Sequence, residues 1–314
     1  MKILFMGTPD FAVTALRALH AKYGADIVGV VTRIDMPKNR GHALTPPPVK
    51  VAAQELGLPV YQPQNLKAEN FKETLESLDP DIIVVAAYGK ILPEYVLTYP
   101  KHECLCIHAS YLPEYRGAAP IARAIMDGKK ELGITIMYMD KGIDTGDMLV
   151  REKLAFENEN KGEIENTLSE LGARMIIETL EKIENGESLP REKQDDTLSC
   201  YAEKIEKEDC KIDFAASAEA IRNKIRALAP APYAFSRING KSVKITLASL
   251  TGEQTDKEPG TVVDVSAKGT GKLLVATGNG VISIDRLIPE GKKEMSAGDL
   301  VRGRGAAIGD KFEF

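Results

Sequence analysis

A histidine at the end of an apolar run and a carboxylate in a later loop are the residues best suited to proton transfer. His108 closes the apolar run Cys104–His108. Asp144 lies in segment 139–147, which carries three carboxylates and two glycines and follows the apolar run 134–139. A carboxylate beside an imidazole can hold the ring's orientation, stabilise the imidazolium and relay a proton. This is the chemistry that acyl transfer to an amine requires.

Other interpretations of these two segments remain open from their residues alone. An isolated histidine at a strand end is also compatible with a structural role, and an acidic loop with a solvated turn. A calcium loop is excluded, because the ligand spacing and the distal glutamate are missing. We interpret His20 and His102 as surface residues of a helix and a polar loop.

The first half of the chain alternates short apolar runs with helical patterns, which is typical of an open parallel sheet with crossover helices. Ligands of such sheets bind beyond the carboxyl ends of the strands, so the loops that follow the runs are candidate sites. Gly7 belongs to no G-x-G-x-x-G pattern, which leaves a dinucleotide site without support. The apolar runs are 2–6, 27–32, 81–87 and 104–108.

The second half has a different pattern, with short β-rich runs and glycine-rich turns from residue 234 onward. Such spacing predicts a small barrel or sandwich. A polar stretch around Pro190 is a predicted linker. We therefore predict a Rossmann-like α/β domain over 1–189, a linker over 190–207 and an OB-like β-barrel over 208–314.

Composition narrows the class of protein. The chain has 314 residues, 43% of them hydrophobic and 28% charged, and a net charge of −5. These values suit a globular protein of two domains, and they argue against one that coats nucleic acid through charge alone. No apolar run approaches the roughly 18 residues of a membrane span, and the first residues resemble a strand more than a secretory signal. We expect a cytoplasmic protein with reduced cysteines.

Several blocks taken together resemble the folate-dependent formyltransferases, over essentially the whole chain. The resemblance rests on His108-Ala-Ser-x-Leu-Pro-x-x-Arg-Gly117, followed by Gly142-Ile-Asp-Thr-Gly-Asp147. Further blocks are FMGTPDFA at 5–12 and AYGKILP at 87–93. Each block alone is weak, but their joint occurrence in this order is specific. The resemblance implies transfer of the formyl group of 10-formyltetrahydrofolate to an amine, with no metal.

The resemblance also implies a role for each matching residue. His108 assists proton transfer and polarises the formyl group, and Asp144 tunes His108 and a bound water. We expect these two side chains to converge beside a pocket for a reduced pterin. The residues expected to line the folate are Ser110, Tyr111, Leu112 and Pro113, with Tyr88, Gly89, Ile91 and Leu92 covering the pterin side.

Cys106 departs from the family pattern, which has an asparagine two residues before the histidine. That asparagine's amide donates to the oxyanion of the tetrahedral intermediate, whereas a thiol is a weak hydrogen-bond donor. Position 106 is therefore a catalytic position occupied by an unusual residue. We expect slower transfer unless another donor replaces the amide.

The acceptor that the resemblance implies is the methionine carried by initiator tRNA, which places the chain in translation initiation. A long basic loop at 33–50 corresponds to an insertion that enters the acceptor stem, and Arg40 sits at the position of its key arginine. Lys38 belongs to the same loop, and Lys207 and Arg226 could extend a basic strip in the second half. We expect a monomer. The alternatives are a formyltransferase for a small-molecule amine and a tRNA-binding protein whose catalysis Cys106 has weakened.

Overall fold

The computed structural model describes residues 1–38, 43–269 and 271–313 and divides into two compact units. The first comprises Met1–Pro120, Glu131–Ala155 and Glu165–Ala202, and the second comprises Ile121–Lys130, Phe156–Ile164 and Glu203–Phe314. Two short segments from the first half of the chain therefore cluster with the second half. Each unit has its own core and is described by itself.

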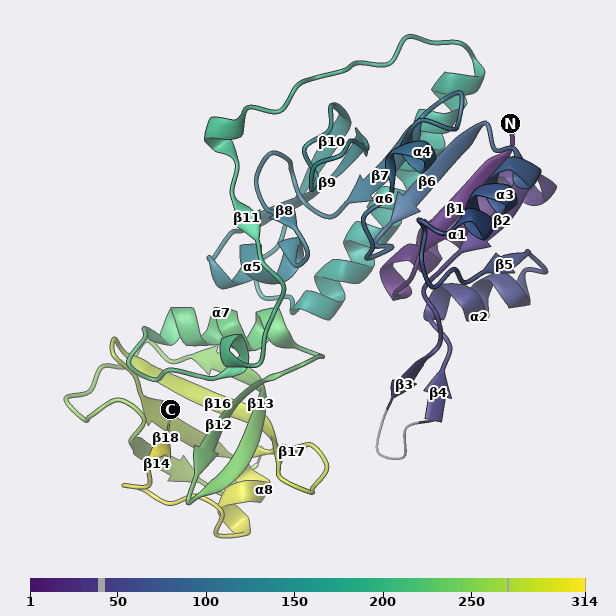
Figure 1. Ribbon diagram of the computed structural model, residues 1–314. Helices are drawn as coiled ribbons and strands as arrows, with labels where there is room; N and C mark the ends of the chain where they lie inside the picture. Colours follow the sequence, from purple (N-terminus) through teal and green to yellow (C-terminus); the bar gives the residue numbers. More distant parts are fainter. Residues whose placement is uncertain (39–42, 270, 314) are drawn as a thin grey trace. The chain divides into compact units, whose positions relative to one another are not determined.

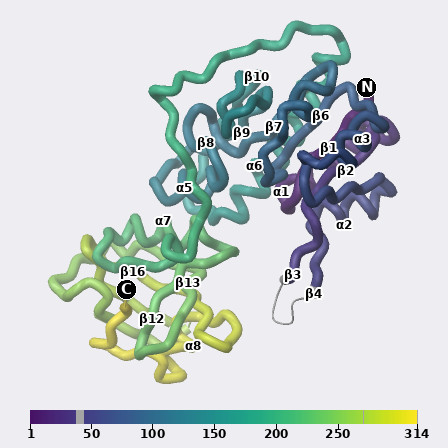
Figure 2. Tube along the Cα trace, viewed as in Figure 1, coloured from purple at the N-terminus to yellow at the C-terminus, as the bar shows by residue number. Residues whose placement is uncertain are grey.

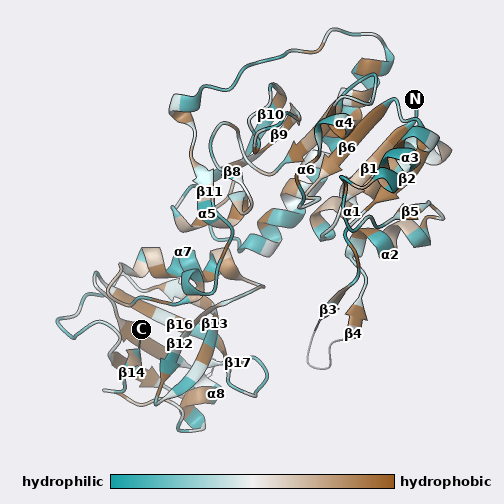
Figure 3. Cartoon of the chain, in the orientation of Figure 1, coloured by the Kyte–Doolittle hydropathy of each residue, from teal (hydrophilic) through white to brown (hydrophobic). Residues whose placement is uncertain are grey.

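A seven-stranded sheet forms the centre of the first unit, in the order β10-β9-β7-β6-β1-β2-β5 (Figure 1). Its central strands consist largely of apolar residues, which Figure 3 shows in brown for β1 and β6, and both of these strands are wholly buried. The bounds are β1 Ile3–Gly7, β2 Ile27–Val31, β5 Val60–Tyr61, β6 Ile82–Ala86, β7 Cys104–His108, β9 Glu131–Tyr138 and β10 Met148–Ala155.

The sheet has the expected parallel, Rossmann-like core, and two antiparallel strands extend it. From β5 to β7 all neighbours are parallel, but β9 is antiparallel to β7, and β10 is antiparallel to β9. Antiparallel neighbours can be joined by a short loop, whereas parallel ones need a crossover. The loop 139–147 joins β9 to β10 in this way. Because β9 is antiparallel to β7, the loop begins beside the first residues of β7, at the opposite end of that strand from His108.

Helices cover both faces of this sheet. On one face, α1 and α6 pack together, with Thr14 Oγ1 lying 3.0 Å from Ser169 Oγ. On the other, Phe71 and Leu75 of α3 pack in one cluster with Leu4 of β1. The helices up to residue 202 are α1 Asp10–Tyr23, η1 Gly24–Asp26, α2 Pro48–Glu55, α3 Glu69–Leu78, α4 Glu94–Leu97, α5 Pro120–Met126, α6 Lys161–Glu184 and η2 Asp196–Leu198.

The alternation of β7 assigns its side chains to the two faces. Ile107 meets α6, where a Cβ on Gly172 would lie only 2.6 Å from the Ile107 side chain. Because successive strand residues point to opposite faces, Cys106 and His108 lie on the face away from α6. Their antiparallel partners on β9 are Met137 and Thr135.

The basic loop at 33–50 contains structure of its own. Met36–Lys38 forms β3 and Ala43–Thr45 forms β4, an antiparallel hairpin that extends away from the sheet of its unit (Figures 1 and 2). Met36 is 53% and Leu44 69% exposed. Sequence reasoning missed the hairpin because the two strands are only three residues long.

A curled antiparallel sheet forms the second unit, in the order β14-β15-β16-β13-β12-β18, with β17 beside β16. Hydrogen bonds from Phe312 N to Gly260 O and from Val262 N to Asp310 O, both 2.8 Å, join its first and last strands. The elements are η3 Glu208–Cys210, α7 Ala218–Leu228, β12 Ala234–Ile238, β13 Lys241–Leu250, β14 Val262–Ser266, β15 Lys272–Ala276, β16 Val281–Pro289, β17 Met295–Ser296, α8 Ala297–Arg302 and β18 Phe312–Glu313.

Ile221, Ile225 and Leu228 of α7 pack onto the apolar side of this sheet. Their spacing of three and four residues places them on one face of the helix. In the described part of the chain, no helix combines the length and the apolar character needed to cross a membrane.

Candidate active site

The structure places His108 between a carbonyl and a carboxylate. His108 Nε2 lies 3.1 Å from the Tyr115 carbonyl oxygen, and Nδ1 lies 3.5 Å from Asp144 Oδ2. Because a carbonyl can only accept a hydrogen bond, we assign the hydrogen to Nε2. Nδ1 is then the nitrogen that can take up a proton, and an Nδ1–H would face the carboxylate. The imidazole is 6% exposed, so few contacts with water weaken this arrangement.

Both partners of His108 have uncommon backbone conformations. Tyr115 has φ +57° and Asp144 has φ +55°, in the left-handed region that non-glycine residues rarely adopt. Such residues cost of order 1–3 kcal/mol and persist only where the surroundings impose them. The contacts around the two residues therefore determine where the carbonyl and the carboxylate point.

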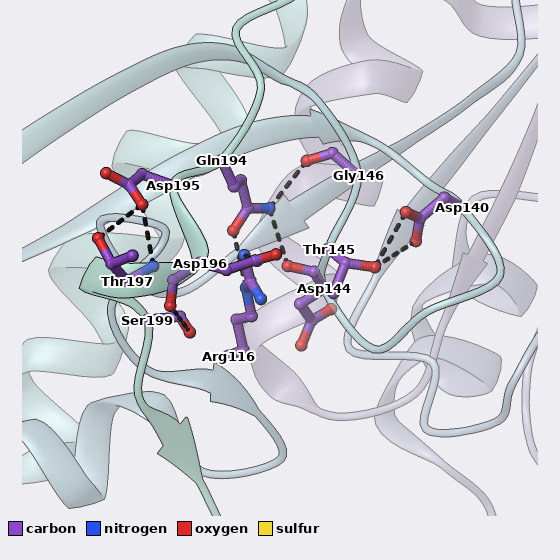
Figure 4. A network of polar contacts seen from close by, with 10 residues as sticks. All are labelled: Arg116, Asp140, Asp144, Thr145, Gly146, Gln194, Asp195, Asp196, Thr197 and Ser199. Atoms are coloured by element: carbon purple, nitrogen blue, oxygen red, sulfur yellow. Dashed lines mark hydrogen bonds and ion pairs between the residues drawn. The ribbon is translucent and has the colours of Figure 1, made fainter.

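The loop that carries Asp144 begins near the start of β7 and folds back to reach His108 at the end of that strand. Asp144 Oδ2 accepts a hydrogen bond of 2.8 Å from the Gly117 backbone. Within the loop, Thr145 Oγ1 donates to both carboxylate oxygens of Asp140, as Figure 4 shows. A Cβ on Gly146 would lie 1.8 Å from the Tyr138 carbonyl oxygen, so only glycine allows this close return of the chain.

Gln194 is a residue of this site that sequence reasoning missed. Its Nε2 donates to the backbone oxygens of Asp144 and Gly146, at 2.9 and 2.8 Å, and its Oε1 accepts from Arg116 Nε at 2.8 Å (Figure 4). Residue 194 fell in the predicted linker because the stretch around Pro190 is polar. The block that contains Arg116 and Gly117 gave the only sequence signal for this contact.

The segment after α6 belongs to the first unit, and Figure 1 traces its path from α6 to β11. Its strand β11, Tyr201–Ala202, pairs in parallel with β8, Arg116–Gly117. Tyr115 N donates to Cys200 Sγ at 3.2 Å. The residue whose carbonyl accepts from His108 is thus held by this segment.

The predicted folate-lining loop after His108 is organised by β9 and β10. Thr135 Oγ1 donates to the Ser110 carbonyl and accepts from Leu112 N, at 2.7 and 3.0 Å. The Leu112 carbonyl accepts from Arg151 at 2.8 Å, and the guanidinium lies 4.8 Å from the Tyr111 ring centroid. Pro113 is buried. Several of the main-chain groups expected to meet the folate therefore also bind within the chain, and Thr135 and Arg151 shape the loop.

The predicted pterin loop after β6 divides into buried and exposed residues. Tyr88 and Leu92 are 2% and 4% exposed and belong to the core beneath α3, whereas Ile91 is 76% exposed. Burial raises the pKa of Tyr88 to about 12. Its hydroxyl has no hydrogen-bond partner among the described residues. Gly89 has φ +80°, which suits the tight turn between the buried Tyr88 and the exposed Ile91.

Cys106 lies in an apolar pocket on the same face of β7 as His108. It is 7% exposed and packs with Leu112, Met137 and Met148. Burial, followed by the nearby Asp144 charge, raises the pKa of the Cys106 thiol well above its usual value. The side chain is therefore a neutral thiol, which can donate only weakly.

The residues predicted to contact tRNA have different environments. Lys38 ends β3, and Arg40 lies outside the described residues. Lys207 is exposed directly before η3. Arg226 is only 9% exposed and donates to Asn223 Oδ1 and to the Glu159 carbonyl, each at 3.0 Å. Burial lowers the pKa of Arg226. Its guanidinium is occupied inside the second unit, which disfavours a direct contact with tRNA.

In the described ranges, no group of three or more His, Cys, Asp or Glu side chains is arranged to hold a metal ion.

The sequence matches two family models that together span most of the chain. Residues 1–180 match the formyl transferase family and residues 204–305 match its C-terminal domain. The chain therefore belongs to the formyl transferase family.

Full-length relatives in this family carry a more specific name. The chain is 45% identical over 304 residues to methionyl-tRNA formyltransferase of Geobacter metallireducens, covering 96% of each protein. It is also 45% identical over 312 residues to methionyl-tRNA formyltransferase of Halalkalibacterium halodurans, covering 98% of this chain and 96% of the relative.

The fold is shared with HypX from Aquifex aeolicus, which was solved in complex with tetrahydrofolic acid. The TM-score is 0.65 at 18% identity, and the match covers 98% of this chain but 48% of HypX. At this identity the likeness concerns the fold alone.

Proposed function

We propose that this chain transfers the formyl group of 10-formyltetrahydrofolate to the amino group of methionyl initiator tRNA, which gives formylmethionyl-tRNA for translation initiation. The single observation that carries the proposal is the pairing of His108 with Asp144 at 3.5 Å in a chain of this family. Support for the acceptor comes from the full-length relatives named methionyl-tRNA formyltransferase.

The donor supplies a formyl carbon bonded to nitrogen, which the methionyl amine attacks. His108 Nδ1 takes the proton that the amine loses, because Nε2–H is bound to the Tyr115 carbonyl. Asp144 stabilises the imidazolium that results, and the same proton can then be returned to the nitrogen that leaves. Burial of the imidazole strengthens this electrostatic effect, since little water screens it.

The folate is proposed to bind along the loops after β6 and β7. Ser110, Tyr111, Leu112 and Pro113 form one side of this site. On the other side, the exposed Ile91 is the residue of the pterin loop best placed to touch a ligand, while Tyr88 and Leu92 anchor the loop in the core and Gly89 forms its turn. The exposed apolar side chain of Ile91 suits the flat ring system of a pterin.

The tRNA is proposed to contact the β3–β4 hairpin and the second unit. Lys38 ends β3, and Arg40, outside the described residues, is the second proposed contact in this loop. We propose that the curled sheet of the second unit is an OB-like barrel, a common platform for nucleic acid. Lys207, directly before η3, is a proposed tRNA contact of this unit. The division 1–189, 190–207 and 208–314, a monomeric state and a cytoplasmic location complete the proposal.

The direct test is formylation of charged tRNA by the purified chain. We expect formylation of methionyl initiator tRNA to require 10-formyltetrahydrofolate, and elongator methionyl-tRNA to be a poorer acceptor. Transfer to a small amine but not to the tRNA would instead identify a formyltransferase of small molecules. Binding of tRNA without formylation would identify a tRNA-binding protein weakened by Cys106.

Salt dependence is expected to report the contacts of the hairpin with tRNA. Replacing Lys38 and Arg40 together by alanine should weaken binding and reduce the slope of log K against log salt by about 1 to 2, because two phosphate contacts are lost. The control is Lys72→Ala on α3, whose side chain is 58% exposed and pairs with Glu76. Equal slopes for the double variant and the control would argue against the hairpin contact.

A further inference from the structure

We propose that Gln194, oriented by Arg116, is a positioning residue for formyl transfer that holds Asp144 beside His108. The proposal deepens the function given above and rests on it, because it takes the reaction of His108 and Asp144 as given. The predicted linker would then be a structural part of the active site. Figure 4 shows Gln194 between the Asp144 loop and Arg116.

The hydrogen bonds of Gln194 fix the orientation of its amide. Nε2 faces two backbone carbonyls, those of Asp144 and Gly146, which can only accept. Oε1 faces Arg116 Nε, which can only donate. Reversing the amide would place donor against donor and acceptor against acceptor. The amide therefore has one arrangement, and in it all its strong partners are satisfied.

The Asp144 loop needs such a clamp because of its path. It leaves β9 beside the first residues of β7, and it must return toward the other end of β7 to bring Asp144 to His108. Asp144 then adopts φ +55°, a conformation that the residue does not favour by itself. Gln194 binds the carbonyl of that residue and the carbonyl two positions later. It thereby fixes the stretch of backbone that directs the carboxylate.

Arg116 connects this clamp to the other contact that holds Asp144. It is 9% exposed, and its Nη2 also donates to Asp196 Oδ1 at 2.8 Å. The next residue, Gly117, donates its backbone N–H to the Asp144 carboxylate. A Cβ on Gly117 would lie 2.8 Å from the Ala202 carbonyl oxygen, so β11 packs tightly against this pair. The Gly117 N–H thus binds the Asp144 carboxylate directly, and the Arg116 side chain orients Gln194, which binds the Asp144 backbone.

The test is Gln194→Met, which keeps the length of the side chain and removes its hydrogen bonds. We expect kcat for methionyl-tRNA formylation to fall by roughly 10- to 100-fold, since a displacement near 1 Å can cost about 100-fold in rate. KM for 10-formyltetrahydrofolate and for tRNA should change by less than about threefold, because neither substrate binds Gln194. Gln194→Glu, which still accepts from Arg116 but cannot donate to the two carbonyls, should behave in the same way.

A double-mutant cycle separates positioning from a general structural effect. If Gln194 acts through Asp144, adding Gln194→Met to Asp144→Asn should cause little further loss of kcat. An equal loss in both backgrounds, or a loss confined to KM, would overturn the proposal. The matched control is Lys193→Ala, the exposed neighbour, which should keep wild-type kcat. Thermal unfolding identifies a variant that has failed to fold, and Gln194→Glu then carries the test.

The proposed function and this inference fail in distinguishable ways. A wild-type chain that does not formylate methionyl-tRNA contradicts the proposed function. A wild-type chain that does so, together with fully active Gln194→Met and Gln194→Glu variants, contradicts only the role of Gln194.

Discussion

Replacement of His108 by alanine is expected to lower kcat for formylation of methionyl initiator tRNA by about 1000-fold, within the roughly 100- to 10,000-fold range of general acid–base catalysis. The imidazole supplies the titratable nitrogen that faces Asp144, and alanine can neither take up nor return a proton. KM for both substrates should change much less. Single-turnover formylation separates chemistry from product release.

The control for this prediction is His102→Ala. His102 lies in the turn before β7, whereas His108 ends the strand, so the two belong to opposite ends of β7. Normal kcat is expected for this variant. Loss of activity in both variants would point to damaged folding, and full activity of His108→Ala would exclude the imidazole as the proton carrier.

Asp144→Asn tests the other half of the pair. Asparagine has nearly the same shape and can still accept from Gly117 N, but it carries no charge to stabilise the imidazolium. We expect a fall in kcat of about 100-fold or more. If Asp144 served only to shape its loop, the asparagine variant would keep most of its activity.

The alternating pattern of the first half was sufficient to predict the α/β unit, because buried central strands are long runs of apolar residues. The antiparallel direction of β9 and β10 could not be predicted in this way. β9 is buried along most of its length, as the parallel strands are, and direction depends on the length and path of the connection. The loop 139–147 is short enough for a direct return.

His108 and Asp144 were predictable because their residue types and their family pattern both indicated catalysis. Gln194 was not predictable, since a glutamine in a polar stretch has no periodicity and belongs to no motif. Its role depends on the return of the chain to the first unit, where β11 pairs with β8. Arg226 illustrates the opposite failure. Its charge suggested a surface contact, but the pattern does not reveal that Asn223 and the Glu159 carbonyl bind the guanidinium inside the unit.

The position of Cys106 leads to the second large effect, which is a gain. Residues 106 and 108 lie on one face of β7, so a side chain at 106 is directed to the side of the sheet where His108 acts. The Cys106 thiol stays neutral because burial raises its pKa. It is therefore a weak donor to a negative charge that develops on the formyl oxygen.

Cys106→Asn is expected to raise kcat, by up to about 100- to 1000-fold if no other group donates to that oxygen, which corresponds to roughly 3 to 4 kcal/mol of transition-state stabilisation. Asparagine is close to cysteine in volume and brings an N–H2 group to the same position. The measurement is kcat for methionyl-tRNA formylation, with KM for the folate recorded in parallel. A smaller gain would measure how much of the oxyanion's stabilisation other groups already supply.

The apolar surroundings of residue 106 set the cost of this change and the control it needs. Met137, Met148 and Leu112 offer an amide no partner, so the variant should lose roughly 1–3 kcal/mol of folding free energy when no ligand is bound. Cys106→Ala has no donor and should show neither the gain in kcat nor this polar cost. A folded Cys106→Asn protein with an unchanged or lower kcat would mean that backbone N–H groups or the imidazole already stabilise the oxyanion, so that the thiol costs the enzyme little.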